Sequence, residues 1–211
     1  MNIAWFIITV VIVFCLLVSS ELFWRRHKTH SEFSRKFVHI TVGSFVAFWP
    51  FYLGWGQIQT LSIAFLIVVS ISKYFKLFQA IHSVQRPTWG EIFFAAAVGL
   101  TTLVTHDKYL FAAALLQMSL ADGFAAIIGI RYGKRSRYYI GGHAKSVVGT
   151  GAFILISLTI LGIYGLRAGV SLQPLTLLSI ALTTAAVENI GIFGLDNLLV
   201  PLLAAAALKA Y

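Results

Sequence analysis

Long apolar runs follow one another along nearly the whole chain, with short polar segments between them. Eight runs come close to the roughly 20 residues that a helix needs to cross a bilayer. They lie near residues 2–23, 37–54, 57–73, 91–106, 109–130, 147–166, 173–190 and 196–210. Pro201 lies just inside the last run, where the helix would begin late or bend. The pattern predicts an all-α membrane protein with seven or eight transmembrane helices in one bundle; six or seven full spans with re-entrant pieces is the alternative.

Composition supports the membrane class. Hydrophobic residues make up 59% of the 211 residues, and charged residues only 11%. A water-soluble globule needs a more polar surface than this composition can supply. The sequence shows no soluble domain, low-complexity linker or clear internal repeat. We therefore expect residues 1–211 to form a single polytopic membrane domain.

The basic residues are unevenly distributed among the polar segments. Thirteen of the sixteen Lys and Arg residues lie in the alternate segments 24–36, 73–90 and 131–146, and the opposite set holds only three. Positively charged loops stay in the cytoplasm, so the N-terminus is predicted to be outside. Basic loops at the anionic inner leaflet explain most of the net charge of +9, and nucleic acid is not expected as a partner. A short chain without a transit peptide is typical of a prokaryotic plasma membrane protein.

Four of the seven acidic residues lie inside or at the edges of apolar runs, namely Glu91, Asp122, Glu188 and Asp196. The predicted orientation puts all four toward the cytoplasmic side. Glu91 and Asp196 would begin helices, where capping alone can explain a carboxylate. Glu188 would end a helix and Asp122 lies about two turns inside its run, so neither suits a cap. An ionisable group at membrane depth costs at least about 2.5–3.5 kcal/mol, which favours a cation or ligand site over a structural polar pair at these two positions.

Basic and small polar residues gather at the same predicted face. Lys36 and His39 are three residues apart at the start of the second helix, and Arg86 precedes the fourth. The segment GGHAKSVVGTG combines glycines with Lys145 and Ser146 where a helix begins, a pattern typical of phosphate binding. The alternatives are ordinary, because Lys and Arg are common at cytoplasmic rims, glycines allow close helix packing, and a lone histidine often only packs.

Carboxylates that hold a divalent cation, together with cations that hold phosphate oxygens, form one chemical set. Mg²⁺ is usually bound by one or two carboxylates and by substrate phosphates, which this inventory supplies. The sequence contains no GxxxxGK[ST] loop, kinase-type glycine-rich loop, Cys/His zinc cluster or GxSxG nucleophile motif. We therefore expect Mg²⁺, or another divalent cation, beside a nucleotide or phosphorylated lipid in a site of a membrane type.

Five blocks of the sequence occur in the order of a known set of motifs. They are SRKFVHITVG (34–43), RPTWGEIFF (86–94), ADGFAAIIGIRYGK (121–134), KSVVGTGAF (145–153) and VENIGIFGLDNLLVP (187–201). Together they resemble the CTP-dependent polyprenol kinase family, which includes phytol, farnesol and dolichol kinases and is more distantly related to phosphatidate cytidylyltransferases. The resemblance covers residues 34–201, the expected catalytic core, and the first apolar run carries no motif.

The resemblance implies transfer of the γ-phosphate of CTP to an isoprenoid alcohol at the cytoplasmic membrane surface, with a divalent cation. By motif position, Asp122, Glu188 and Asp196 would be the catalytic acids and metal ligands, and Glu91 would be a further metal ligand. The nucleotide would be held by Lys145, Ser146, Arg131, Lys134, Lys36, Arg86, His39 and Asn197.

Two other functions stay open at this point. A CTP-dependent diacylglycerol kinase or a phosphatidate cytidylyltransferase would use much the same Mg²⁺ and CTP apparatus. A small cation or solute transporter is the more remote alternative. Its acids should be spread along the membrane depth, whereas these gather toward one face.

Overall fold

The computed structural model describes residues 3–27, 32–75 and 88–211, so Arg86 lies outside the described residues. The long helices are α1 (Ile3–His27), α2 (Glu32–Ala47), α3 (Trp55–Tyr74), α5 (Gly90–Val104), α6 (Lys108–Leu116), α7 (Asp122–Tyr132), α8 (Val147–Ala168), α9 (Pro174–Ile190) and α10 (Asp196–Leu208). The short elements are η1 (Trp49–Phe51), η2 (Gln117–Ala121), η3 (Lys134–Ser136), β1 (Arg137–Ile140) and β2 (His143–Ser146).

Each of the eight apolar runs contains a helix, and the run near 109–130 forms α6, η2 and α7 in succession. Within the described residues, four helices are long and apolar enough to cross a membrane. They are Ile3–Phe23, Trp55–Tyr74, Lys108–Tyr132 and Val147–Ala168. Shorter apolar helices are Gly90–Val104, Pro174–Ile190 and Asp196–Leu208. A helical membrane protein is thus confirmed, while the number of spans and the outside N-terminus stay predictions.

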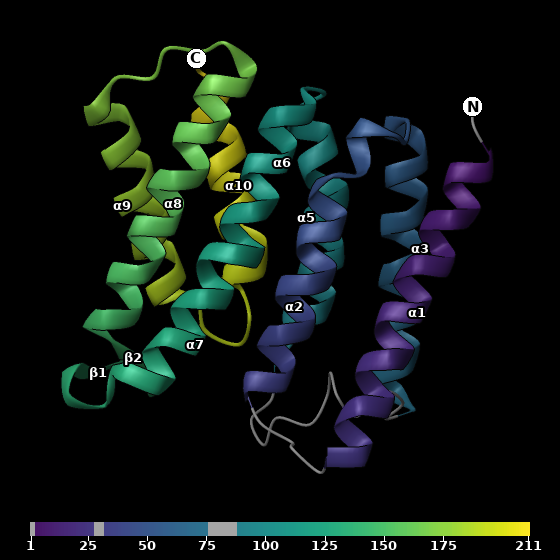
Figure 1. The fold of residues 1–211 in the computed structure, drawn as a ribbon, viewed down its shortest axis with the longest axis horizontal. Helices are drawn as coiled ribbons and strands as arrows, with labels where there is room; N and C mark the ends of the chain where they lie inside the picture. The colour runs from purple at the N-terminus through teal and green to yellow at the C-terminus, as the bar shows by residue number, and fades with distance from the viewer. Residues whose placement is uncertain (1–2, 28–31, 76–87) are drawn as a thin grey trace.

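Two local features differ from the expectation. Helix α10 begins at Asp196, where the predicted run begins, so the alternative of a late start after Pro201 is wrong, while Pro201 lies inside the helix. The basic segment after α7 contains an antiparallel hairpin, in which Arg137 of β1 pairs with Ser146 of β2. Both features lie at the end of the bundle opposite the two chain termini (Figure 1).

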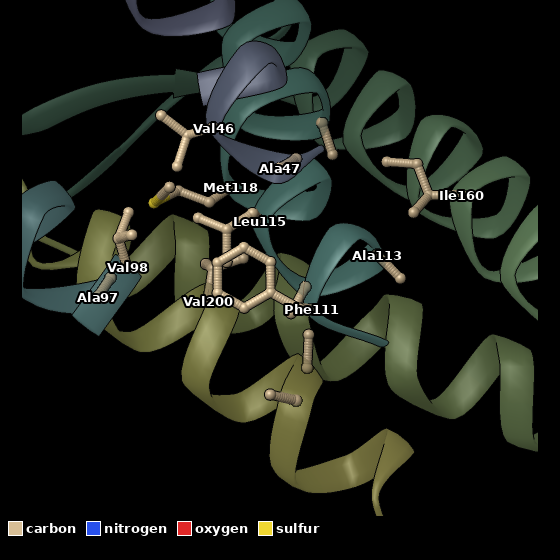
Figure 2. Close-up of a cluster of buried hydrophobic side chains, with 14 of the residues drawn as sticks. Val46, Ala47, Ala97, Val98, Phe111, Ala113, Leu115, Met118, Ile160 and Val200 are labelled. Carbon is tan, nitrogen blue, oxygen red and sulfur yellow. The ribbon is translucent and has the colours of Figure 1, made fainter. Parts of the chain in front are cut away.

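The helix formed by α6, η2 and α7 lies at the centre of the bundle. In its most apolar stretch 67% of the residues are buried, against 6% for α1. Phe111, Leu115 and Met118 of this helix are fully buried. Figure 2 shows them packed among Val98 of α5, Val200 of α10 and other apolar side chains. The central helix is therefore fixed from several sides, whereas α1 exposes most of its apolar surface.

Candidate active site

Three acidic residues from different helices meet at one end of the bundle. Asp122 begins α7, Glu188 lies near the end of α9, and Asp196 begins α10. One carboxylate oxygen of each lies within 4.8 Å of the others. Asp122 is 2% exposed, Glu188 5% and Asp196 9%. Three buried carboxylates at this separation repel one another unless cations balance them.

Close helix packing places Asp122 in this cluster. The residues before it, Gln117–Ala121, form a π-helical turn, a distortion that often occurs at functional sites. A Cβ atom added at Gly123 would lie 2.2 Å from Cγ1 of Ile40, so only glycine lets α2 approach α7 this closely. A Cβ at Gly43 would likewise lie 2.4 Å from Cβ of Ser119. These contacts hold the middle of α2 against η2 and the start of α7.

Asp196 is placed by a tight turn between α9 and α10. Phe193 and Gly194 both have a positive φ, of 56° and 88°. A Cβ at Gly191 would lie 2.7 Å from Cβ of Asp196, so the turn folds directly against the acid. The turn also docks on the start of α5, because the Trp89 amide donates to the Phe193 carbonyl at 2.9 Å. The position of Asp196 therefore depends on α5 as well as on its own helix.

Two lysines and a histidine contact the carboxylates. Lys36 Nζ donates to Asp122 Oδ2 at 2.5 Å, and His39 Nε2 lies 3.6 Å from the same oxygen. Lys145 Nζ donates to the Glu188 carbonyl at 2.9 Å and also to the Glu188 carboxylate. Lys145 lies in β2, outside the membrane-spanning segments. Burial lowers its pKa, but the carboxylates of Glu188 and Asp122 raise it by more, so the net pKa is above the ordinary value and the side chain is charged at neutral pH.

The residues present fit a hard divalent cation. Three carboxylates supply the oxygen ligands that Mg²⁺ prefers. Oδ1 of Asp196 is buried and has no hydrogen-bond partner among the described residues. Two ammonium groups balance only part of the negative charge of three ionised carboxylates. The cluster therefore has both the ligand atoms and the charge for one more cation.

A cavity of about 380 Å³ adjoins the cluster. All three acids line it together with Lys36 and Lys145. Arg35, Thr88, Arg137, His143, Ser146 and Gly149 also contribute to its wall. The hairpin is held over it by Tyr138, whose hydroxyl donates to Asn189 Oδ1 and lies 2.6 Å from Thr150 Oγ1. The cavity wall thus combines three carboxylates with the basic side chains of lysine and arginine.

Comparison with known proteins adds a relative to this geometry. No protein-family model matches the chain, and no solved structure matches it. A phytol kinase from Synechocystis is 32% identical to it over 195 residues, which is 89% of this chain and 82% of the relative. The chain belongs to the polyprenol kinase family. The family inferred from the five motifs is thereby confirmed.

Two of the basic residues that were expected to bind the nucleotide lie outside the main cavity. Arg131 is exposed, with its guanidinium 5.6 Å from the centre of the Tyr132 ring, and Lys134 is exposed in η3. Neither lines the cavity, whereas Arg137 of the hairpin does. The sequence offered no signal for Arg137 beyond the basic character of its loop, because the hairpin that turns it toward the cavity was not predicted.

Three further expected site residues lie beside the main cavity rather than in its wall. Glu91, His39 and Asn197 line a second cavity of about 60 Å³, between α1, α2, α3, α5 and α10. Asn197 Nδ2 donates to the Gly90 carbonyl at 2.9 Å. Glu91 does not belong to the carboxylate cluster. The structure therefore gives no support to its expected role as a fourth metal ligand.

Ser146 has a definite structural task at the main cavity. Its hydroxyl accepts a hydrogen bond from the Gly149 amide at 3.0 Å and thereby caps α8. Gly149 lines the cavity together with Ser146, so the positive end of the α8 macrodipole lies at the cavity wall. The expected glycine-bearing turn into a helix is therefore present, with a β-hairpin in place of an irregular loop.

Proposed function

We propose that this protein is a membrane-embedded lipid-alcohol kinase that transfers the γ-phosphate of CTP to an isoprenoid alcohol such as phytol. The observation that carries the proposal is the cluster of Asp122, Glu188 and Asp196, which faces a cavity lined by lysine and arginine. The similarity to a phytol kinase supports an isoprenoid alcohol as the acceptor. CTP as the donor rests on the motif resemblance.

The proposed roles follow from the contacts of each residue. Asp122, Glu188 and Asp196 would hold a divalent cation such as Mg²⁺, which when bound neutralises charge on the donor phosphates. Lys36 and Lys145 line the same cavity and would bind phosphate oxygens there. Arg137, from the hairpin, would contribute a third positive charge. Phosphoryl transfer depends mainly on such positioning and charge neutralisation.

In the proposed reaction, the hydroxyl oxygen of the alcohol attacks the γ-phosphorus in line with the leaving group. A new bond forms between that oxygen and phosphorus, and the bond from the γ-phosphorus to the β-γ bridging oxygen breaks. The products are the lipid phosphate and CDP, and the hydroxyl proton leaves to a carboxylate of the site or to water. We place this reaction at the cytoplasmic surface of the plasma membrane, because Arg137 and Lys145 of the basic segment 131–146 line the same cavity as the cluster.

Purified protein, supplied with CTP labelled at either the α or the γ phosphorus, tests the proposal. Phytol, farnesol, geranylgeraniol, diacylglycerol and phosphatidate would serve as acceptors, with γ-labelled ATP as the comparison donor. We expect label from the γ position of CTP in the isoprenoid phosphate and none from the α position. Label only in diacylglycerol would indicate a diacylglycerol kinase, and α label in a phosphatidate acceptor would indicate a cytidylyltransferase. Movement of a cation or small solute across liposomes that contain the protein, without any lipid labelling, would indicate a transporter.

A further inference from the structure

Glu91 is a buried carboxylate that lacks hydrogen bonds. Its side chain is 10% exposed, and the nearest cation, Lys73 Nζ, lies 3.8 Å from Oε2. Among the described residues neither Oε1 nor Oε2 has a hydrogen-bond partner. Lys73 itself donates to the Thr88 carbonyl and lies 4.4 Å from the centre of the Trp89 ring. A buried acceptor without a donor is unfavourable, so a hydrogen-bond donor from outside the described residues would stabilise this carboxylate.

Neither expected role of Glu91 accounts for this arrangement. A capping carboxylate accepts hydrogen bonds from backbone amides at the start of its helix. Helix α5 begins at Gly90, whose amide donates to Thr88 Oγ1 at 3.1 Å, and among the described residues Glu91 accepts no hydrogen bond from the start of this helix. A metal ligand would lie with the other acids, but the cluster consists of Asp122, Glu188 and Asp196. The unpaired oxygens of Glu91 therefore need another explanation.

The cavity beside Glu91 has mostly apolar walls. The apolar wall residues are Leu17, Val38, Val42, Phe65, Val69 and Phe94. The polar ones are Arg35, His39, Glu91 and Asn197. Its volume of about 60 Å³ is far below that of the main cavity and too small for a nucleotide. An apolar cavity with a few polar groups suits the hydroxyl-bearing end of a lipid, with the remaining chain outside.

This second cavity abuts the carboxylate cluster. Arg35 lines both cavities, and His39 of the second cavity lies 3.6 Å from Asp122 Oδ2. Asn197 follows Asp196 directly and is hydrogen-bonded to the residue before Glu91. A hydroxyl group held at this point would lie next to the proposed phosphate site without occupying it.

The second cavity lies behind an apolar outer face of α3. Val69 of α3 lies in its wall and is 4% exposed. The neighbouring residues Ile67 and Val68 are 52% and 50% exposed, so this part of α3 turns an apolar face outward. In a membrane that face contacts lipid tails. Helix α3 therefore separates the second cavity from the lipid by a single layer of side chains.

We propose that the second cavity is the acceptor site, in which Glu91 accepts a hydrogen bond from the hydroxyl of the isoprenoid alcohol and the apolar walls hold its first isoprene unit. This inference rests on the proposed function and adds the acceptor site to it. The hydroxyl satisfies the unpaired carboxylate, and Glu91 orients the oxygen toward the carboxylate cluster. Arg35, which lines both cavities, would lie between the acceptor and the donor.

The first test separates acceptor binding from donor binding. Glu91→Met removes the acceptor oxygens at similar length, and we expect the KM for phytol to rise at least about tenfold, because one charged hydrogen bond is lost, while the KM for CTP stays within about twofold. Glu91→Gln keeps one acceptor oxygen and should restore part of the effect. Asp107→Asn removes one carboxylate at the far end of the bundle and should change neither constant. Equal changes in both KM values for Glu91→Met would overturn the inference.

The second test fills the cavity. Val69→Phe places a large side chain in the cavity wall, and Val68→Phe places the same side chain on the adjacent exposed face. We expect only Val69→Phe to raise the KM for phytol, with CTP binding by equilibrium dialysis unchanged in both. Matching behaviour of the two variants toward phytol would contradict the acceptor site.

A photoreactive probe makes the site testable without turnover. A diazirine-bearing phytol should crosslink to peptides of α3 and α5 in the wild type, and Val69→Phe should reduce that labelling more than Val68→Phe. If the wild type phosphorylates no alcohol but shows this labelling, the proposed function fails and the binding site stands. If it phosphorylates phytol but the labelling lies elsewhere, the proposed function stands and the acceptor site fails.

Discussion

Asp122 has charged neighbours on two sides. Lys36 donates to its Oδ2 at 2.5 Å, while oxygens of Glu188 and Asp196 lie within 4.8 Å. One carboxylate therefore both pairs with a lysine and belongs to the cluster that we propose as the cation site. An amide at this position would keep the size of the side chain but lose the negative charge that a divalent cation requires.

We expect Asp122→Asn to lower phosphate transfer at least about 100-fold, because removing one preorganised group from an active site typically has an effect of this size. Membrane insertion and yield should be unchanged. Transfer from γ-labelled CTP to phytol measures the effect. The matched control is Asp107→Asn, since Asp107 caps α6 through the Leu110 amide and asparagine caps equally well. Near-normal transfer by Asp122→Asn would remove Asp122 from the catalytic centre.

Lys145 and Arg135 offer a second comparison. Lys145 lines the main cavity and pairs with Glu188, whereas Arg135 is exposed in η3 and does not line it. Lys145→Gln should raise the KM for CTP about 10- to 100-fold, since a charged contact to phosphate contributes about 1.5–3 kcal/mol. Arg135→Gln should leave it within about twofold. Equal weakening of CTP binding by the two substitutions would contradict this prediction.

At the scale of elements, the close contact of α2 with α7 sets the distance between Lys36 and Asp122. Gly123→Ala would force the two helices apart, because its Cβ would lie 2.2 Å from Cγ1 of Ile40. We expect a loss of about 1–3 kcal/mol in stability and a lower rate of transfer. Thermal unfolding in detergent and the phytol assay measure the two effects.

Gly151→Ala on α8 is the control for this contact, because an added Cβ there meets nothing within 4 Å. Alanine in a helix is more favourable than glycine by up to about 1 kcal/mol, so this variant should be neutral or more stable. Ile40→Ala combined with Gly123→Ala should recover part of the lost activity. Equal behaviour of Gly123→Ala and Gly151→Ala would show that the helix contact does not matter.

The helices could be predicted from the sequence, but the side of each helix that faces the core could not. Each run is apolar on all sides, because one side meets the core and the other meets lipid, so no amphipathic pattern fixes its rotation. Glu91 and Asp196 therefore looked alike, each at the start of a helix, although they line different cavities. The acids 122, 188 and 196 were predicted at one face, but the pairing of Lys36 with Asp122 depends on a glycine contact that no local pattern reveals.

For the whole molecule, the end that carries the hairpin should lie in the cytoplasm. The end of α1, the start of α2, the end of α3 and the segment from the end of α7 to β2 lie at that end (Figure 1), and these described parts carry ten of the sixteen Lys and Arg residues. In a Cys15→Ser background, Ser136→Cys in η3 should react with a membrane-impermeant maleimide only after cells are permeabilised. Ser171→Cys, between α8 and α9, should react in intact cells. The reverse pattern would invert the predicted orientation.

The two cavities that share Arg35 differ in which phase can fill them. In the proposed function, the larger, charged cavity would take a solute from water, and the smaller, mostly apolar one would take a molecule already dissolved in the bilayer. The effective concentrations of the two substrates would then be expressed in different units. The rate of transfer should follow the concentration of CTP in solution but the mole fraction of alcohol in the membrane, so that diluting the alcohol with inert phospholipid slows the reaction even when its total amount is constant.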